Sequence, residues 1–261
     1  MSPADSPWHI LRTQAERAVQ AEPVLSSTFR EAILDQPDFA FALAHRVSQA
    51  LADSEEQQAA LFDRFSSIHQ QFPALAESAW CDLQAIVSRD PAFGTGLEVL
   101  LFSKGFLALQ AYRIGHQLLL QDERLLAMFI QARCNERLAV DINPASQIGS
   151  GIMLDHATGI VIGETAAVGD DVSILQGVTL GGTGKESGDR HPKVRSGVMI
   201  GAGAKILGNI EIGEGAKVGA GSVVLQAVAP HTTVVGNPAR QVGKPRHARP
   251  ALDMDQSFDD G

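Results

Sequence analysis

The stretch IGAGAKILGNIEIGEGAKVGAGSVV, residues 200–224, repeats a simple pattern every six residues. Each unit begins with an aliphatic residue, and a second small or apolar residue follows four positions later. Such a six-residue repeat indicates a parallel β-helix. Ten units follow the rule in phase, apart from one two-residue slip near 159–161: Ile148/Ile152, Leu154/Thr158, Ile162/Ala166, Val168/Val172, Ile174/Val178, Ile200/Ala204, Ile206/Ile210, Ile212/Ala216, Val218/Ser222 and Val224/Val228.

The composition of residues 140–249 fits such a coil. Twenty of the 25 glycines fall there, and no Phe, Tyr or Trp occurs between Phe129 and Phe258. Three six-residue faces enclose a narrow column of aliphatic side chains that has no room for a ring, and glycine suits corners that need positive φ. A helical alternative fails, because each glycine would cost about 1 kcal/mol relative to alanine inside a helix.

Residues 1–139 follow a different pattern. Apolar residues recur at spacings of three and four, as in Leu61, Phe65 and Ile68, which is typical of amphipathic helices. The pairs Thr28-x-x-Glu31 and Ser54-x-x-Gln57 have the form of capping boxes. The spacing predicts helices near residues 7–20, 28–35, 38–51, 55–71, 73–88, 104–120 and 122–137.

The segment GGTGKESGDRHPKVRSGVM, residues 181–199, interrupts the six-residue repeat. It is long, polar and rich in glycine, so it must leave the coil and return to it. Long loops inside compact domains are usually functional or disordered. We expect a protruding loop that offers an imidazole and several cations, namely Arg190, His191, Lys193 and Arg195.

Charge and composition exclude several classes of function. The formal net charge of −9 argues against nucleic acid as a partner, although residues 140–249 carry ten Lys or Arg against nine Asp or Glu and would accept an anionic small molecule. No run of 18 apolar residues predicts a membrane span, and the N-terminus lacks the pattern of a secretory signal. Two cysteines are too few for a disulfide framework, which favours a reducing cytoplasm.

Asp155 and His156 place two titratable groups in the otherwise apolar stretch 153–164. The repeat turns Leu154 inward, so the pair lies outside or at a corner, either as a solvated surface pair or as part of a catalytic site. A neutral imidazole acts as a general base when a carboxylate holds its tautomer. We favour Asp141 for this role, because it lies 15 residues earlier, a little under one 18-residue coil, whereas adjacent strand residues point apart.

These motifs resemble those of the bacterial serine O-acetyltransferase family. The similarity extends over roughly residues 70–256; its most specific parts are DHATGIVIGE and GGTGK…GDRHPK, and it includes SRDPA and KGFLALQAYRIGH. Together with the two patterns it implies an α+β fold class. We expect an all-helical oligomerisation domain (1–139), a left-handed parallel β-helix acyltransferase domain with a protruding loop (140–244) and a flexible tail (245–261).

The resemblance implies transfer of an acetyl group from acetyl-CoA, as co-substrate, to the hydroxyl of L-serine. The products are O-acetyl-L-serine and CoA, in the first committed step of cysteine biosynthesis. At the matching positions, His156 would remove the hydroxyl proton and Asp141 would orient it. Serine itself is the nucleophile, so neither a Ser or Cys nucleophile nor a metal is required.

The resemblance also implies two clamps for a free amino acid. Arg190 and His191 would hold its carboxylate and steady the charge that develops in the reaction. Asp90 and Asp155 would receive its ammonium group. L-cysteine can occupy the same clamps, so feedback inhibition by L-cysteine is implied.

Acetyl-CoA is expected along the outside of the coil, where exposed backbone offers a smooth surface for its pantetheine arm. Lys217 is a candidate phosphate partner or else a solvated side chain, and a backbone N–H in the loop 181–184 is a candidate oxyanion donor. One prism is too shallow to enclose acetyl-CoA, and the family builds its sites between neighbouring prisms of a trimer, with two trimers meeting through the helical domains. The expected acetyl-CoA contacts are Gly182, Ala202, Gly203, Lys217 and Ala220.

Other functions and one partner are left open at this point. An acetyltransferase for homoserine or a sugar would keep the base without needing both clamps, and a non-catalytic scaffold would tolerate loss of His156. A zinc hydratase would need a pair of histidines at short spacing, which this sequence lacks. Family members that bind cysteine synthase end in isoleucine, whereas this sequence ends Asp259-Asp260-Gly261, so that partner stays uncertain.

Overall fold

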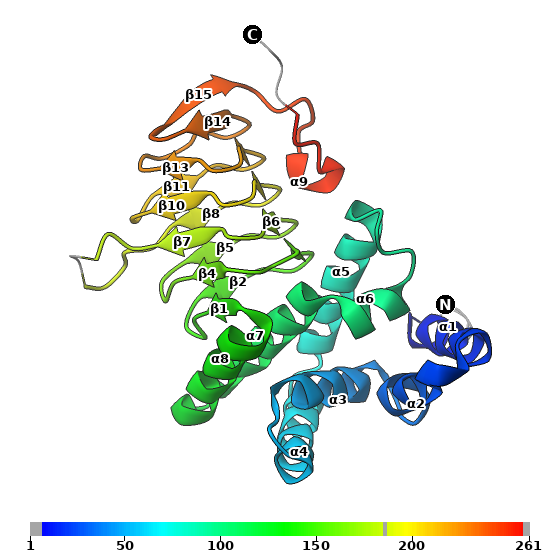
Figure 1. The fold of residues 1–261 in the computed structure, drawn as a ribbon. Coiled ribbons are helices and arrows are strands. Elements are labelled where there is room, and N and C mark those ends of the chain that lie inside the picture. The colour runs from blue at the N-terminus through cyan, green and yellow to red at the C-terminus, as the bar shows by residue number, and fades with distance from the viewer. Residues whose placement is uncertain (1–6, 185–186, 258–261) are drawn as a thin grey trace.

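The computed structural model describes residues 7–184 and 187–257. A helical body carries a tall triangular prism of short strands, and one long loop projects from the side of the prism (Figure 1). Within those residues no helix is both long and apolar enough to cross a membrane. The helical body contains α1 (Pro7–Ala21), η2 (Pro23–Leu25), α2 (Ser26–Phe29), η3 (Arg30–Leu34), α3 (Phe39–Leu51), α4 (Glu55–Gln71), α5 (Ala74–Arg89), α6 (Gly96–Phe102), α7 (Lys104–Leu120) and α8 (Arg124–Leu138).

Most of the helices lie within a few residues of their predicted positions, and the differences have local causes. Ser54 caps α4 as predicted, since its hydroxyl accepts a hydrogen bond from the Gln57 N–H at 3.2 Å. Thr28 is no cap, because it lies inside α2, and the predicted helix 28–35 divides into α2 and the π-helical turn η3. Sequence analysis missed α6, although the Thr95 hydroxyl caps it by accepting from the Glu98 N–H at 3.3 Å, and the Glu98 carboxylate accepts from the Gly94 N–H at 2.7 Å.

The prism is built of three parallel sheets, which we call A, B and C. Sheet A holds β1 (Val140–Ile142), β4 (Ile160–Ile162), β7 (Thr179–Gly181), β10 (Lys205–Leu207) and β13 (Val223–Val224). Sheet B holds β2 (Gln147–Ile148), β5 (Ala167–Val168), β8 (Lys193–Val194) and β11 (Glu211–Ile212). Sheet C holds β3 (Met153–Asp155), β6 (Ser173–Leu175), β9 (Met199–Ile200), β12 (Lys217–Val218), β14 (Thr233–Gly236) and the antiparallel β15 (Ala239–Gly243).

The strand register confirms the six-residue repeat and locates its interruptions. Ile162 pairs with Leu180, and Ile206 pairs with Val224, eighteen positions apart in both cases. The first coil is two residues longer, because Ile142 pairs with Ile162, and the extra residues lie between Leu154 and Ile162. Leu180 pairs with Ile206, twenty-six positions on, so the loop between β7 and β8 adds eight residues to the third coil.

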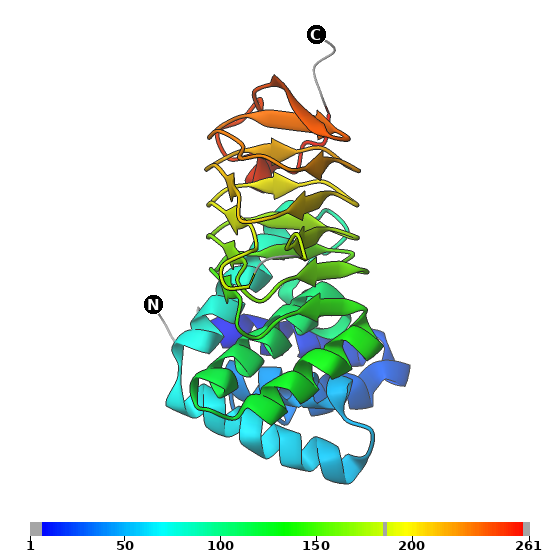
Figure 2. The same ribbon diagram turned by 90° about the vertical axis from the view of Figure 1, so that its left-hand side faces the viewer.

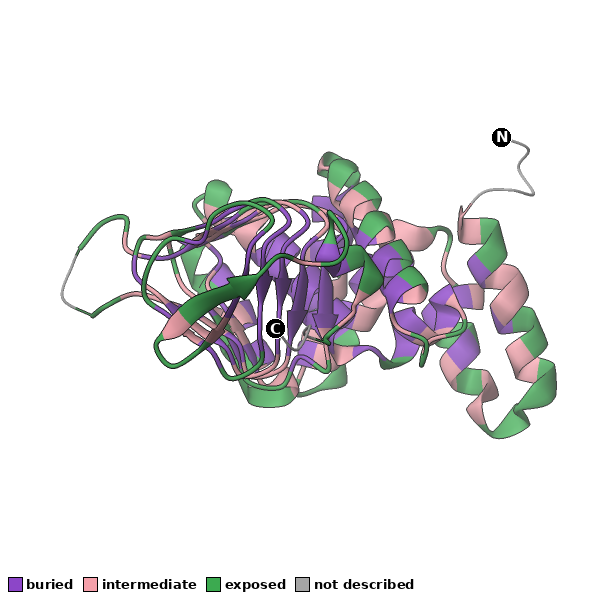
Figure 3. Ribbon diagram, turned by 90° about the horizontal axis from the view of Figure 1, so that it is seen from above, coloured by how far each residue is buried: buried purple, intermediate pink, exposed green. Residues whose placement is uncertain are grey.

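Aliphatic side chains fill the interior of the prism. Seen from above in Figure 3, the strands around this interior are coloured as buried. The column consists of Ile, Val, Leu and Ala from all three sheets. Tyr112 of α7 packs against its lower end and donates a hydrogen bond from its hydroxyl to the Ser146 carbonyl at 2.6 Å. The helical body therefore forms the floor of the column.

A buried ion pair joins the helical body to the first coil. The Asp82 carboxylate of α5 is fully buried and accepts hydrogen bonds from Nε of Arg113 at 2.9 Å and from Nη2 at 3.0 Å. It also accepts from Nε2 of Gln110 at 3.1 Å and from the Ile152 N–H at 2.9 Å. Arg113 in turn donates to the Gly149 carbonyl at 2.6 Å. Two helices and one corner of the prism thus meet at a single carboxylate.

Replacement of Asp82 by alanine leaves the buried Arg113 charge without its partner. We expect Asp82→Ala to lower the free energy of unfolding by about 3–5 kcal/mol, as is typical when one member of a buried pair is removed. Urea unfolding followed by circular dichroism measures this loss. The exposed carboxylate Asp53, which pairs with Arg133 and Arg137, provides the control, and Asp53→Ala should change stability far less. Equal losses in the two variants would contradict the role given to the buried pair.

Candidate functional site

The prism has three vertical edges, and two of them carry the predicted site residues. The chain runs from sheet A to B to C and back to A, so edge C–A follows β3, β6, β9 and β12, whereas edge A–B follows β1, β4, β7 and β10. His156 lies on edge C–A of the first coil. Arg190 and His191 lie on edge A–B of the third coil, at the foot of the protruding loop.

A cavity of about 360 Å³ opens where α5, α6 and α7 meet β3. His156 stands at this cavity with its side chain 73% exposed, whereas the Asp155 side chain is only 14% exposed. Nε2 of His156 lies 3.7 Å from Oδ1 of Asp155. The lining residues are Ile86, Asp90, Ala92, Phe93, Phe102, Ser103, Lys104, Gly105, Met153, Leu154, Asp155 and His156.

Two carboxylates share this cavity. Burial raises the pKa of Asp155, the neighbouring His156 lowers it, and the negative charge of Asp90 raises it further. The Asp90 carboxylate also accepts a hydrogen bond from the Ala92 N–H at 2.9 Å, which fixes the turn that follows α5. Two acidic groups with limited access to water favour a cationic guest such as an ammonium group.

The backbone turns His156 outward. His156 and Ala157 have φ of 53° and 58°, in the left-handed region that few residues other than glycine adopt. The two additional residues of the first coil lie at this corner, between β3 and β4. Backbone strain of this kind clusters at functional sites. The corner therefore projects an imidazole beside the cavity.

His191 occupies a very different environment on edge A–B. Its ring is buried, and Nδ1 accepts a hydrogen bond from the Thr165 N–H at 3.2 Å and lies 2.8 Å from the Thr165 hydroxyl. That hydroxyl accepts from the N–H groups of Arg190 and His191 at 3.0 and 3.2 Å, so its own proton points to Nδ1. Burial, followed by the charge of Arg190, lowers the pKa of His191. The neutral ring thus carries its proton on Nε2 as a donor.

Local contacts fix the foot of the loop. Arg190 pairs with Glu164 at 2.7 Å and donates to the Gly188 carbonyl at 3.1 Å. Gly182 lies against Arg190, since a Cβ added at Gly182 would stand 3.2 Å from Cγ of the arginine. Nζ of Lys193 bonds to Asp189 at 2.5 Å and to the Thr165 carbonyl at 2.9 Å. Of these residues, sequence analysis did not anticipate Glu164 or Thr165.

A single chain does not bring the two groups of residues together. The loop of Arg190 and His191 projects on the left of Figure 1, whereas α5 and α6, which border the cavity, lie on the right. Figure 2 shows the same loop from the front, halfway up the prism. Each chain therefore carries two separate groups of predicted site residues, one on edge C–A and one on edge A–B.

Asp141 lies in β1 of sheet A, and its carboxylate accepts a hydrogen bond from Nε2 of Gln131 at 2.7 Å. Within the described ranges no hydrogen bond joins Asp141 to His156 in one chain. The spacing argument assumed an 18-residue coil, but Asp141 stacks on Val161, twenty positions further. The structure thus gives Asp141 a partner that the sequence pattern did not predict.

Three of the residues expected to contact acetyl-CoA continue the edge of His156 upward. Ala202 and Gly203 form the C–A corner above β9, and Ala220 belongs to the next corner. Glycines with positive φ stack along this edge, namely Gly159, Gly177, Gly203 and Gly221. Backbone is therefore exposed above the imidazole. Gly182 lies apart from these residues, on edge A–B.

Lys217 is also expected to contact acetyl-CoA, but it lies on sheet C and is almost fully buried. Its Nζ donates a hydrogen bond to the Ser257 carbonyl at 2.6 Å. Of the predicted tail, residues 250–257 contain the short helix α9 (Pro250–Asp253), and Ala251 is buried against Leu175 and Met199. The C-terminal segment thus covers part of sheet C.

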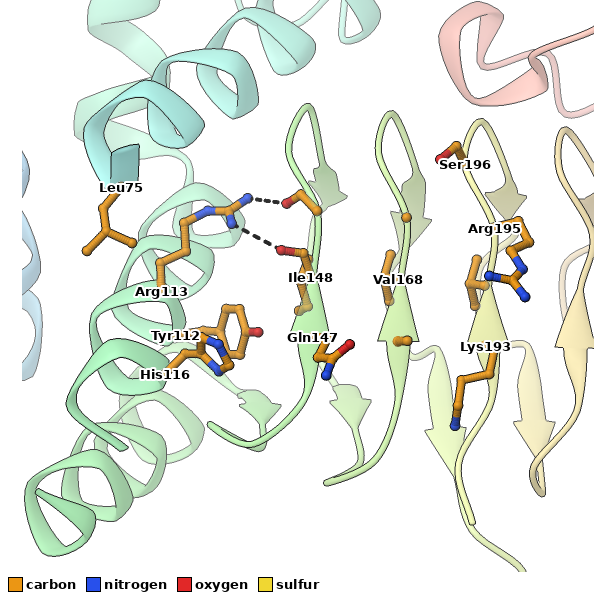
Figure 4. A pocket seen from close by; sticks show the side chains of 14 residues that line it. Leu75, Tyr112, Arg113, His116, Gln147, Ile148, Val168, Lys193, Arg195 and Ser196 are labelled. Atoms are coloured by element: carbon orange, nitrogen blue, oxygen red, sulfur yellow. Dashed lines mark hydrogen bonds between the residues drawn. The ribbon is translucent and has the colours of Figure 1, made fainter. Parts of the chain in front are cut away.

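A larger cavity of about 710 Å³ lies on sheet B, away from His156 (Figure 4). The helical body contributes Leu75, Tyr112, Arg113 and His116 to it, and β2, β5 and β8 supply the opposite wall. Two of its polar groups from α7 already have partners: Arg113 bonds to the first-coil carbonyls, and Nδ1 of His116 donates to the Pro144 carbonyl at 2.8 Å. Sequence analysis gave no sign of this cavity.

Comparison with known proteins relates the geometry to a family. The family model for the N-terminal region of serine acetyltransferase matches residues 8–111, and the model for six bacterial transferase hexapeptide repeats matches residues 191–226. A serine acetyltransferase of Escherichia coli (strain K12) is 53% identical over 251 residues, which cover 96% of this chain and 92% of that protein. The crystal structure of serine acetyltransferase from Vibrio cholerae superposes with a TM-score of 0.94 at 52% identity and covers 96% and 97% of the two chains.

Related structures contain small molecules. A serine acetyltransferase in complex with cysteine has a TM-score of 0.93 at 50% identity, covering 96% of this chain and 98% of that one. The enzyme of Brucella abortus was solved with coenzyme A, at 46% identity and a TM-score of 0.88, covering 91% and 95%. The enzyme of Neisseria gonorrhoeae was solved with serine, at 47% identity and a TM-score of 0.87, covering 90% and 97%. From the family models and these identities over nearly its whole length, the chain belongs to the serine acetyltransferase family.

Proposed function

We propose that this chain transfers the acetyl group of acetyl-CoA to the hydroxyl of L-serine and releases O-acetyl-L-serine and CoA. The observation that carries the proposal is the cavity of about 360 Å³ in which Asp90 and Asp155 lie beside the exposed imidazole of His156. Two carboxylates attract the ammonium group of an amino acid, and the imidazole provides a base. Relatives solved with serine and with coenzyme A support this choice of substrates.

The reaction proceeds by direct transfer between the two bound substrates. His156 removes the proton of the serine hydroxyl, whose oxygen attacks the thioester carbonyl of acetyl-CoA. The tetrahedral intermediate collapses with cleavage of the carbon–sulfur bond, and the protonated imidazole returns its proton to the CoA sulfur. We retain Asp141 as the group that orients the base, which requires its carboxylate to exchange the Gln131 amide for His156 when the site is assembled. A backbone N–H of residues 181–184 donates to the oxyanion. Loss of one such donor costs about 3 kcal/mol in other enzymes.

The amino-acid carboxylate binds Arg190 and His191. Both are suited to this task, because the guanidinium is permanently charged and the neutral His191 ring presents an Nε2–H donor. This clamp lies on edge A–B, whereas His156 lies on edge C–A. We infer that edge C–A of one copy meets edge A–B of a neighbouring copy, as in a trimer of prisms. Acetyl-CoA lies in the same groove, along Ala202, Gly203 and Ala220.

The helical domain provides the contact between two such trimers in this proposal. Several large apolar side chains are exposed on it, among them Val24, which is 88% exposed, and Leu125, which is 84% exposed. Exposed apolar side chains mark a protein–protein interface where they gather in one patch, and contact between copies would cover them. We therefore propose that residues 1–139 serve in assembly. They also line the cavity of Asp90, Asp155 and His156, which we call the amino-acid cavity.

L-cysteine acts as a feedback inhibitor in this proposal. It carries the same ammonium and carboxylate groups as L-serine, with a thiol in place of the hydroxyl, so the same two clamps hold it. A relative solved with cysteine supports this view. Inhibition competitive with L-serine follows from the shared clamps.

Removal of the base should abolish most of the activity. We expect His156→Ala to lower the rate of serine-dependent CoA release by about 10²–10⁴, the usual contribution of general-base catalysis. The assay compares L-serine, homoserine and no acceptor, with the exposed His247 replaced by alanine as control. Wild-type rates in His156→Ala would exclude His156 as the general base. Release of CoA with homoserine alone would identify homoserine as the acceptor in place of L-serine. No release from the wild type with any acceptor would favour a non-catalytic scaffold.

The affinity for L-serine should fall as the pH falls. The ammonium clamp needs an ionised Asp155, and burial raises the pKa of this carboxyl, so protonation begins at a higher pH than for an ordinary aspartate. The KM for L-serine should therefore rise on acidification before the KM for acetyl-CoA does. Asp90→Asn removes a charge that raises the pKa of Asp155, and it should shift this rise to lower pH while raising KM throughout. An unshifted profile in Asp90→Asn would contradict the coupling of the two carboxylates.

A methyl group at Gly163 should disturb the carboxylate clamp. A Cβ at this position would stand 2.0 Å from Cδ2 of His191, so the ring must move. We expect Gly163→Ala to raise the KM for L-serine by about tenfold or more, the scale expected for a misplaced binding group. Gly243→Ala is the matched control, because a Cβ there meets no atom within 4 Å. An unchanged KM for L-serine in Gly163→Ala would show that His191 does not bind the carboxylate of the amino acid.

A further inference from the structure

The side chain of Arg89, the last residue of α5, contacts a corner of the prism. Arg89 directly precedes Asp90, and its side chain is only 3% exposed. Nη2 of Arg89 lies 3.2 Å from Oδ1 of Asp171, and Nη1 donates to the Ser173 hydroxyl at 3.2 Å. Both partners belong to the second coil, where the chain turns from sheet B to sheet C. The end of α5 is thus held by a corner of the prism.

The C-terminal segment reaches the same corner from the opposite direction. The Ala251 N–H donates to the Gly197 carbonyl at 3.4 Å, one coil above. Oγ of Ser173 donates to the Ala251 carbonyl at 2.9 Å, and Nη1 of Arg249 lies 3.5 Å from Oδ2 of Asp171. In Figure 1, α9 descends beside the prism toward the end of α5. Asp171 and Ser173 are therefore shared between Arg89 and the C-terminal segment.

At this corner a charged guanidinium is buried with an incomplete set of hydrogen bonds. Burial lowers the pKa of Arg89, and the charge of Asp171 raises it. Nε of Arg89 is buried and has no hydrogen-bond partner within residues 7–184 and 187–257. Asp171 also has φ of 55°, so its carboxylate is presented by a left-handed turn. A buried guanidinium with incomplete hydrogen bonding is a costly way to anchor a helix, and apolar packing would serve a purely structural joint as well.

The position of Arg89 in the sequence gives this anchor a further role. Asp90 is the next residue, and its carboxylate caps the turn at Ala92 and lines the cavity shared with Asp155. A displacement of the end of α5 changes the separation of the two carboxylates. That separation governs how well an ammonium group fits between them.

We propose that Arg89 is a positioning residue for the amino-acid cavity, which it serves by holding the end of α5, and with it Asp90, against Asp171 and Ser173. The C-terminal residues Arg249 and Ala251 complete this anchor by holding the same two partners. The inference rests on the proposed function, because it takes the cavity as the binding site of L-serine.

Steady-state kinetics of the full-length protein test the proposal. We expect Arg89→Gln to raise the KM for L-serine by about tenfold or more, with kcat and the KM for acetyl-CoA within about twofold of wild type. Arg89→Lys should give a smaller increase, because lysine keeps the charge but cannot contact both partners in the same geometry. Arg249→Gln should act in the same direction and more weakly, since this side chain is 55% exposed. Arg64→Gln, which removes an ion pair with Glu123 in the helical body, is the matched control and should leave all three constants unchanged.

A double-mutant cycle separates positioning from general destabilisation. Because Arg89 and Arg249 both act through Asp171, Arg89→Gln combined with Asp171→Asn should raise the KM for L-serine by less than the product of the two single effects. Ser173→Ala serves as a second, milder variant should Arg89→Gln not fold. A folded Arg89→Gln or Ser173→Ala with unchanged serine KM, an equal rise of KM for both substrates, or fully additive effects would each overturn the proposal. Failure of the proposed function has a different signature, namely a wild type that shows no serine-dependent release of CoA.

Discussion

The buried ion pair of Asp82 and Arg113 joins the helical body to the β-helix. The carboxylate of Asp82, on α5, binds α7 and, through the Ile152 N–H, the strand that leads to Asp155. The same helix α5 ends at Asp90. Asp90 and Asp155, which line one cavity, therefore come from the helical body and from the first coil, and their separation depends on how the helical body sits on that coil.

The β-helix was predictable because its physics is local and repetitive. Each coil buries the same kind of residue at the same interval, so the strands, the glycine corners and the protruding loop could be derived from residues 140–249 alone. The helical half was less regular. α6 was not predicted because it is only seven residues long. Thr28 was predicted to cap a helix because Glu31 follows it at the spacing of a capping box, but it lies inside α2. Only tertiary packing decides such cases.

The sequence names candidate residues for the site one by one, but it does not give their arrangement. Motifs identify Asp90, Asp155, His156, Arg190 and His191 as candidates, yet they do not reveal that the two groups lie on different edges of the prism. The contacts that fix the tautomer of His191 come from Thr165, twenty-six positions earlier, and are hidden by the eight residues that the loop adds. The distance argument for Asp141 used the average coil, whereas the first coil is longer by two residues. Irregular coils are where spacing rules fail.

Those irregularities have a meaning of their own. A stacked coil tolerates inserted residues only at its corners, because an insertion within a strand would turn every following side chain to the wrong face. The first coil uses two such residues to project His156, and the third uses eight to carry Arg190 and His191. The repeat supplies the framework, and each departure from it carries candidate site residues. For any chain of this architecture, a map of where the period slips is thus a first map of where to look for reactivity.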